Sequence, residues 1–219
     1  MLFRSLFLLA AFVFCLQING FSQKSRVGFY TGYTNANMYG KIGGERVKDD
    51  ALSGITFGLI LDAPISKSHI SFTPTLSYAQ KGRITFNENS RASNLKEWIA
   101  LRYAELNANF LYNTNGAKGN WFIGGGPSIS FDLPSKKVSK TDDLKTENNI
   151  TFGQEANCDI RGIDYGANLI TGFRMKGGFF VSFNYTVGIR NLVPVQEGND
   201  NNIRNHSLGI NLGFLINNK

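Results

Sequence analysis

The sequence predicts an all-β protein: an eight-stranded antiparallel up-and-down transmembrane β-barrel of the outer-membrane type, preceded by a cleaved signal peptide. Three observations predict it. Apolar and polar residues alternate along residues 179–190 after Phe180, and the same alternation recurs in seven other segments. The connections between these segments are short and long in turn, as in barrels with tight turns at one end and longer loops at the other.

The N-terminal residues have the pattern of a secretory signal peptide. Arg4 supplies an early positive charge, an apolar run follows from Leu6 to Leu16, and small or polar residues follow around Ser22. The apolar run is too short for a comfortable membrane-spanning helix. We therefore expect residues 1–22 to be a signal peptide and residues 23–219 to form one barrel domain. The alternative is an N-terminal anchor helix.

The clearest strand is the segment from Phe179 to Arg190. Its odd positions are all apolar or aromatic, and its even positions after Phe180 are small, polar or charged. Successive side chains of a strand point to opposite faces, so this strand has one apolar and one polar face. About ten residues also suffice to cross a bilayer as a tilted strand. The eight expected strands are residues 26–35, 52–63, 69–81, 98–112, 121–132, 162–175, 179–190 and 206–215.

Two of these strands contain an irregularity. Pro74 lies on the apolar face of the third segment, and a proline cannot donate a hydrogen bond to the sheet. The early half of the fourth segment, around Leu101, alternates less cleanly, which predicts a β-bulge there.

The connections between the strands predict the direction of the barrel. Short connections lie at residues 66–68, 113–119 and 176–178, and long polar ones at 37–50, 84–95, 134–158 and 193–202. With eight strands, both termini fall on the short-turn side. We therefore expect both termini in the periplasm and the long loops outside the cell. The longest loop, 134–158, mixes lysines with acidic residues. It is either a solvated loop or a contact surface for acidic lipopolysaccharide groups or a partner protein.

Alternation alone does not decide which face is buried, since a soluble barrel hides its apolar face inside. We predict that the apolar face contacts lipid, because the polar faces are rich in Gly, Ser, Thr and Asn, which fit a narrow interior. The same faces carry charged residues that would be costly in lipid. We expect a structural polar network inside the barrel, formed by Glu105, Asp164, Arg174 and Arg190. The alternative is an exported soluble barrel or sandwich.

Aromatic residues near both ends of the strands also favour a membrane barrel, in which two aromatic girdles mark the interfaces. Toward the short turns lie Tyr112, Trp121, Phe173, Phe179 and Phe214. Toward the long loops lie Tyr33, Tyr78, Trp98 and Phe131.

The composition argues against several classes of function. The net charge is +7, which in an exported chain suits contact with anionic surface groups rather than nucleic acid. The two histidines, His69 and His206, are expected at opposite ends of the barrel, so we predict no enzyme. Clusters such as 198–202 indicate turns rather than complete calcium loops, and we expect no metal or cofactor. Cys158 would be the mature chain's one cysteine and forms no intrachain disulfide.

Four short stretches carry a family resemblance: Val27–Gly32, Tyr103–Leu106, Phe122–Pro127 and Leu208–Phe214. Through them the mature chain resembles the PorT-like outer-membrane β-barrel proteins of Bacteroidetes. The resemblance implies the barrel fold and hints at a role in secretion. The last stretch is also similar to the terminal signal read by the barrel-assembly machinery, although the chain ends on Lys219 rather than on an aromatic residue.

These observations predict an integral outer-membrane barrel with a non-enzymatic structural, adhesion, assembly or secretion-associated role. The alternatives are a barrel that transports or binds a small solute and, less favoured, an outer-membrane enzyme. The expected partners are outer-membrane lipid and lipopolysaccharide, the assembly machinery during insertion, and an unknown protein at the long loops.

Overall fold

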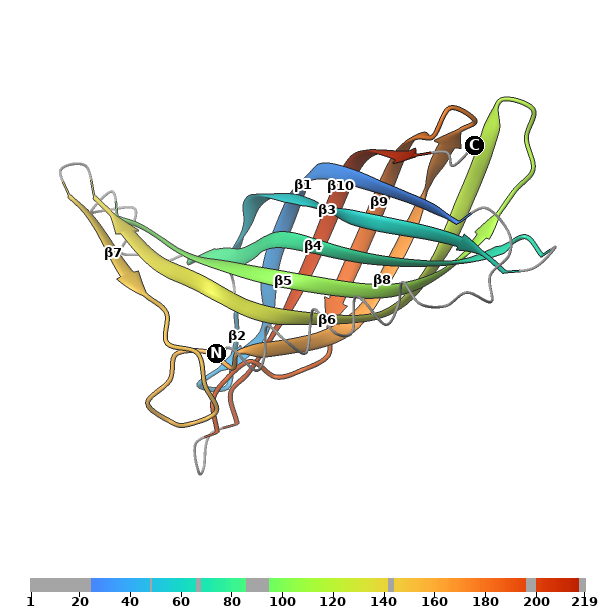
Figure 1. Cartoon of the computed structure of the whole chain (residues 1–219). Helices are drawn as coiled ribbons and strands as arrows, with labels where there is room; N and C mark the ends of the chain where they lie inside the picture. Colours follow the sequence, from blue (N-terminus) through green and yellow to red (C-terminus); the bar gives the residue numbers. More distant parts are fainter. Residues whose placement is uncertain are drawn as a thin grey trace, which may run out of the picture.

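The computed structural model describes residues 25–47, 49–65, 68–85, 95–141, 144–195 and 200–216. They form one antiparallel sheet of eight long and two short strands (Figure 1). The long strands are β1 (Arg26–Ile42), β3 (Asp50–Pro64), β4 (Ile70–Thr85), β5 (Lys96–Asn113), β6 (Gly119–Lys140), β8 (Ile163–Met175), β9 (Phe179–Gly188) and β10 (Asn202–Ile216). The short strands are β2 (Glu45–Arg46) and β7 (Lys145–Asn149). The expected signal peptide, residues 1–22, lies outside the described residues.

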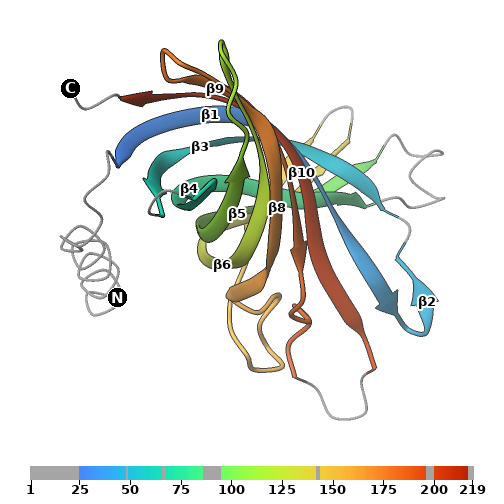
Figure 2. The same ribbon diagram turned by 90° about the vertical axis from the view of Figure 1, so that its right-hand side faces the viewer.

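The sheet closes on itself. Each long strand pairs with the next long strand in the chain, and β10 pairs with β1 from Val27–Ile216 to Lys41–Asn202. Closure leaves no long strand with an open edge. Figure 2 shows the curved strands surrounding a common axis. The predicted eight-stranded up-and-down barrel is therefore confirmed, with β2 and β7 as additions at its long-loop end. The described residues contain no helix with the length and apolar character needed to cross a membrane.

The two faces of the barrel have the predicted orientation. The large apolar side chains of the strands are exposed on the outer surface, among them Phe29, Phe57, Phe110, Ile123, Leu169, Phe183 and Leu212. The polar side chains of the alternate positions are buried inside, among them Thr56, Ser77, Asn109, Asn168, Ser182 and Asn211. A soluble barrel would have the reverse arrangement, so the outer surface is the lipid-facing one.

The strands run further toward the long loops than the sequence pattern predicts. The expected loop 134–158 is wrong in its first part, because β6 continues to Lys140 and pairs there with both β5 and β7. This β6–β7 hairpin spans Lys136 to Asn149 and lies at the end of the barrel opposite to the short turns (Figure 1). Its side chains on β7 are all exposed, so backbone pairing and not an apolar face holds it.

The irregularity expected near Leu101 is present between β5 and β6. The register changes between Ala100–Lys136 and Arg102–Leu133, so Pro134 and Ser135 together oppose Leu101. The extra residue is therefore on β6. Ser135 completes the pairing there, because its Oγ accepts a hydrogen bond of 2.9 Å from the backbone nitrogen of Arg102.

Candidate functional site

The interior of the barrel contains a buried ion pair toward its long-loop half. Lys81 on β4 pairs through Nζ with Glu105 Oε2 on β5, and both side chains are almost fully buried. Ser130 Oγ on β6 donates to the same oxygen at 3.1 Å, and Asn107 Nδ2 donates to Glu105 Oε1 at 3.1 Å. Both carboxylate oxygens are thus satisfied. This matters because an unpaired buried charge costs several kcal/mol.

A second charged cluster closes the short-turn end. Asp62 on β3 accepts hydrogen bonds at Oδ2 from Arg26 at 2.7 Å and from Arg174 at 2.8 Å. Thr73 Oγ1 lies 3.4 Å from the other carboxylate oxygen. The Arg174 guanidinium also lies 5.5 Å from the centroid of the Phe122 ring. The cluster joins three strands that are distant in sequence and holds a net positive charge at this opening.

The other two residues of the expected network lie elsewhere. Asp164 on β8 is buried and accepts a 3.0 Å hydrogen bond from Asn205 Nδ2 on β10. Arg190 donates through NH1 to the backbone oxygen of Ile163 at 2.6 Å, and its guanidinium lies 5.7 Å from the ring centroid of Tyr165, an outward residue. Arg190 forms no ion pair with a described carboxylate. Because β9 ends at Gly188, the alternation that would turn Arg190 inward no longer applies.

No hydrogen bond or ion pair joins any two of the four residues expected to form one network. Asp164 lies within electrostatic range of Glu105, Lys81 and Arg190, whereas Arg174 belongs to the cluster at the short-turn end. Glu105 and Arg174 each have a charged partner, Lys81 and Asp62, that sequence reasoning did not name. Both partners were readable as inward-facing positions, since each has the same parity as the polar residues of its strand. The sequence alone does not predict which charged residues pair, because the pairing depends on which strands face each other across the barrel.

An apolar plug occupies the interior between the two charged clusters. It consists of inward side chains from five strands: Ile60, Leu111, Phe122, Phe180 and Leu215, with Tyr30 and Ile170 packed against them. Two glycines make room for its rings. A Cβ on Gly172 would lie 2.5 Å from Phe122 Cζ, and one on Gly213 would lie 2.4 Å from Phe180 Cζ. The sequence signal for the plug was a large apolar residue at inward positions near each short turn.

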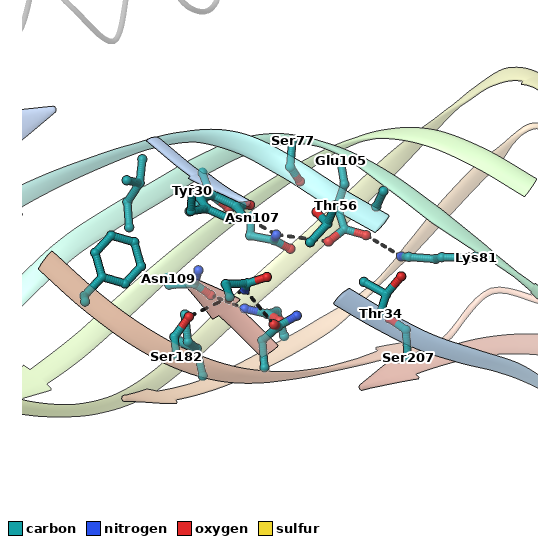
Figure 3. A pocket seen from close by; sticks show the side chains of 18 residues that line it. Tyr30, Thr34, Thr56, Ser77, Lys81, Glu105, Asn107, Asn109, Ser182 and Ser207 are labelled. Carbon is teal, nitrogen blue, oxygen red and sulfur yellow. Dashed lines mark hydrogen bonds and ion pairs between the residues drawn. The ribbon is translucent and has the colours of Figure 1, made fainter. Parts of the chain in front are cut away.

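Polar side chains fill the space between the plug and Glu105 (Figure 3). Asn168 Nδ2 donates to Asn109 Oδ1 at 2.9 Å, and Thr186 Oγ1 donates to Asn168 Oδ1 at 3.0 Å. Asn211 Nδ2 donates to Asn184 Oδ1 at 2.8 Å. Among the described residues the free space here is about 30 Å³, which suffices for only one or two water molecules. The interior is therefore packed and is not an open pore.

The long-loop end contains a second apolar cluster and a cavity. Met38, Leu101 and Tyr103 are buried and pack with the loop residues Ile150, Phe152 and Ile160 and with Ile203. Beside them is a cavity of about 400 Å³, lined by apolar residues such as Ile99 and Leu192 and also by Arg83, Lys137 and Asp159. This volume lies within the range of small-molecule sites. The sequence did not reveal the cavity, because it depends on how the loop after β7 folds back over the opening.

The β6–β7 hairpin carries a small charged cluster outside the barrel. Glu147 pairs with Lys136 at 2.5 Å and with Lys145 at 2.6 Å. The hydrogen bond from Lys136, and then that from Lys145, lowers the pKa of the Glu147 carboxyl to about 2. The hairpin is therefore held in part by a titratable contact.

The residues with catalytic or metal-binding chemistry are scattered. The His69 ring lies 5.7 Å from that of Tyr112 near a short turn, and the His206 ring lies 5.4 Å from that of Tyr39 on the outer surface. In the part of the chain that the structure describes, no three His, Cys, Asp or Glu side chains group as metal ligands would. Cys158 is a free, half-buried thiol in the loop after β7.

A closed antiparallel barrel with an apolar outer wall and a polar, packed interior defines a class: the integral β-barrels of outer membranes. The family model for the outer membrane protein beta-barrel domain matches residues 21–193, and the chain belongs to this family. Family and fold together indicate the outer membrane of a Gram-negative bacterium. A comparison with curated proteins gave no match.

Solved structures of other outer-membrane barrels are similar to this chain. Ail, the attachment invasion locus protein of Yersinia pestis, is 9% identical, with a TM-score of 0.43, over 89% of this chain and 100% of Ail. Neisserial surface protein A is 10% identical, with a TM-score of 0.38, over 85% of this chain and 96% of that protein. The outer membrane enzyme PagL is 13% identical, with a TM-score of 0.34, over 82% of this chain and 97% of PagL. Because both enzymes and non-enzymes share such barrels, these likenesses carry no argument about activity.

Proposed function

We propose that this protein is a non-enzymatic, non-conducting outer-membrane barrel that works through its long-loop end, in a structural, adhesion or assembly role. The packed middle of the barrel carries the proposal, because only about 30 Å³ is free between the apolar plug and the buried ion pair. A barrel without a lumen has only its two ends and its wall for contact with other molecules. The long-loop end has the larger surface, because β6 and β7 extend it.

In this proposal the short turns and both termini face the periplasm, and the long loops face the medium. The short connections 114–118 and 176–178 support it, because outer-membrane barrels have tight periplasmic turns. Leu144, at the tip of the β6–β7 hairpin, is 69% exposed. A Leu144→Cys variant in a Cys158→Ser background should react with a membrane-impermeant maleimide on intact cells. A Lys118→Cys variant in the same background should react only after the outer membrane is broken, and the opposite pattern would reverse the orientation.

The β6–β7 hairpin is the proposed contact surface for a partner protein. Its β7 side chains are exposed and both signs of charge are present at Lys136, Lys145 and Glu147. Replacing residues 137–148 with a two-residue turn should leave a folded, heat-modifiable barrel but remove specific cross-links formed in native outer membranes. A matched shortening of residues 43–46, in the β1–β3 connection, should leave those cross-links in place. Unchanged cross-links in the first variant would contradict this role.

The cavity at the long-loop end favours a second candidate function, the binding of a small ligand. Its lining combines apolar with polar and charged side chains, which suits an amphipathic molecule. An Ile160→Trp substitution should fill the cavity and abolish binding of an apolar fluorescent probe such as 1-anilinonaphthalene-8-sulfonate. A Leu144→Trp substitution outside the cavity should not change it. Equal probe binding by both variants would argue against a ligand site here.

The resemblance to PorT-like proteins supports a narrower role within this proposal, in protein secretion. Removing the gene should then reduce the set of secreted proteins while the other outer-membrane barrels remain at normal levels. Unchanged secretion would leave the structural or adhesion role. The partners of the proposed barrel include outer-membrane lipid around its apolar wall and the assembly machinery during insertion.

A further inference from the structure

The outer wall of the barrel has a basic groove near the long-loop end. Lys41 on β1, Arg46 on β2 and Arg204 on β10 line it, with Tyr39 as one wall and a volume of about 530 Å³. Asp200 is the one acidic residue among its described lining residues. We call these residues the outer basic groove.

The strand register brings the three cations together on the outer face. Lys41 is directly opposite Arg46 in the β1–β2 ladder, and Tyr39 is directly opposite Arg204 in the β1–β10 ladder. Lys41 and Arg204 are therefore diagonal neighbours on one face. These positions have the same parity as the exposed Tyr33 of β1 and the exposed Leu208 of β10, so the groove faces outward.

Among the described residues, the positive charges of the groove exceed the negative ones. Among the described residues, the side chains of Lys41, Arg46 and Arg204 form no ion pair, and no carboxylate lies within 4.0 Å of them. The buried Nε of Arg204 has no hydrogen-bond partner. Like charges that face each other across a ladder destabilise a sheet. A bound anion would remove this repulsion.

The height of the groove indicates which anion reaches it. On β10 the apolar outward residues run from Ile216 to Leu208. The next outward residue, His206, packs against Tyr39 and Tyr185, and an aromatic cluster of this kind marks a membrane interface. Arg204 follows one outward position further along. The cations therefore stand just above the apolar band, where the headgroups of the adjacent lipid leaflet lie.

We propose that the outer basic groove binds the phosphorylated headgroup of an outer-leaflet glycolipid, with Lys41, Arg46 and Arg204 contacting the phosphate and Tyr39 contacting the sugar. The identity of the leaflet rests on the orientation given in the proposed function. The binding chemistry does not, because it follows from the charges and their height. The groove opens to the side, toward lipid, which favours a lipid headgroup over a soluble anion.

Binding can be measured on the whole barrel in detergent micelles, with lipid A that carries its phosphates and lipid A from which they have been removed. The variant Lys41→Gln/Arg46→Gln/Arg204→Gln should bind phosphorylated lipid A about a hundredfold more weakly than the unmodified barrel, since each cation near a lipid surface contributes about fivefold. The dephosphorylated lipid A should bind both barrels weakly. The matched control Lys96→Gln/Lys118→Gln/Lys140→Gln removes the same charge elsewhere and should bind normally.

Three results would overturn the proposal. One is equal binding of phosphorylated lipid A by the groove variant and the unmodified barrel. Another is an equal loss in the control variant, which would assign the binding to overall charge. The third is full displacement of lipid A by an equal concentration of inorganic phosphate, which would identify a site for the free anion. Heat-modifiable migration of each variant establishes that its barrel is folded. Maleimide labelling of Leu144→Cys tests the orientation separately, so the two proposals can fail independently.

Discussion

The buried pair Lys81–Glu105 is a costly contact to disturb. Both are buried, and the three contacts of the Glu105 carboxylate come from Lys81 on β4, Asn107 on β5 and Ser130 on β6. A Glu105→Gln substitution leaves the Lys81 charge without its partner. We expect the free energy of unfolding to fall by about 3–5 kcal/mol, which is typical for breaking a buried pair. Urea unfolding in lipid vesicles measures it.

The matched control for this experiment removes both charges. Lys81→Met/Glu105→Gln should recover most of the lost free energy of unfolding, because no isolated charge remains. If Glu105→Gln alone were as stable as the unmodified barrel, the pair would have no structural role.

A substitution at Gly213 tests the packing of the apolar plug, because it adds a single carbon atom beside the Phe180 ring. A Cβ there would lie 2.4 Å from Phe180 Cζ, so Gly213→Ala forces the ring of the plug to move. We expect a loss of about 1–3 kcal/mol in the free energy of unfolding, as for other overpacked cores. Gly177→Ala is the control, because nothing lies within 4 Å of its added Cβ. A Phe180→Leu change should rescue Gly213→Ala, and failure to rescue would point to a clash elsewhere.

Sequence reasoning succeeded for the face of each residue but not for its partner. Glu105 and Arg174 were expected inside the barrel from the two-residue period of a strand, and both are buried. Arg174 and Asp62 are 112 residues apart, and nothing in the local pattern connects them. The prediction for Arg190 did not apply in the same way. Because β9 ends at Gly188, two residues earlier, the two-residue period of the strand does not determine the direction of this side chain.

Among the elements, the β6–β7 hairpin depends on the charge of Glu147. The lysine contacts lower the pKa of its carboxyl from 4.5 to about 2 in the folded hairpin. Ionised Glu147 therefore stabilises the hairpin fully above about pH 4.5, and this stabilisation is lost as the pH falls through about 2. The hydrogen-exchange protection factors of the β7 amides, which are corrected for intrinsic exchange, should fall as the pH is lowered over that window. In a Glu147→Gln variant the exchange should not respond to pH in this way beyond its intrinsic chemical dependence.

The outward face of β10 tests whether lipid contacts the apolar wall. Leu212 is the middle of the five outward apolar positions from Leu208 to Ile216 and is 49% exposed. A Leu212→Arg substitution should lower the free energy of unfolding in lipid by about 2–4 kcal/mol, and Ile216→Arg near the interface by only about 0–1 kcal/mol. Equal, small effects at both positions would place this face in water.

The sequence predicted every long strand. It did not predict how far several of them extend at the long-loop end. The alternation of apolar and polar residues disappears where a strand leaves the membrane, because both of its faces then contact water. Lys136 to Lys140 pair in a ladder without any such pattern. Pro74 remains inside β4, and no ladder pairing with β3 is recorded between Thr75–Ile60 and Phe72–Ala63, where a missing donor is expected.

For the whole molecule, the layered interior is the feature that most restricts its role. Four layers follow one another along the barrel axis from the short-turn end: the charged cluster around Asp62, the apolar plug, the polar layer and the buried ion pair. Composition predicted small and polar residues inside, but the plug was not foreseen. It is made of single apolar residues on otherwise polar faces, which become one cluster only when the barrel closes.

Conductance in planar lipid bilayers tests this central claim most directly. The purified, heat-modifiable barrel should give no steady current steps, because the space between its plug and its buried ion pair has room for only one or two waters. The matched comparison is a variant with Phe122→Ala and Phe180→Ala, which removes two phenyl rings of the plug. If the plug is the main barrier to ions, this variant should show brief channel openings. Stable, ohmic channels in the unmodified barrel would contradict the account and favour a solute-transporting protein.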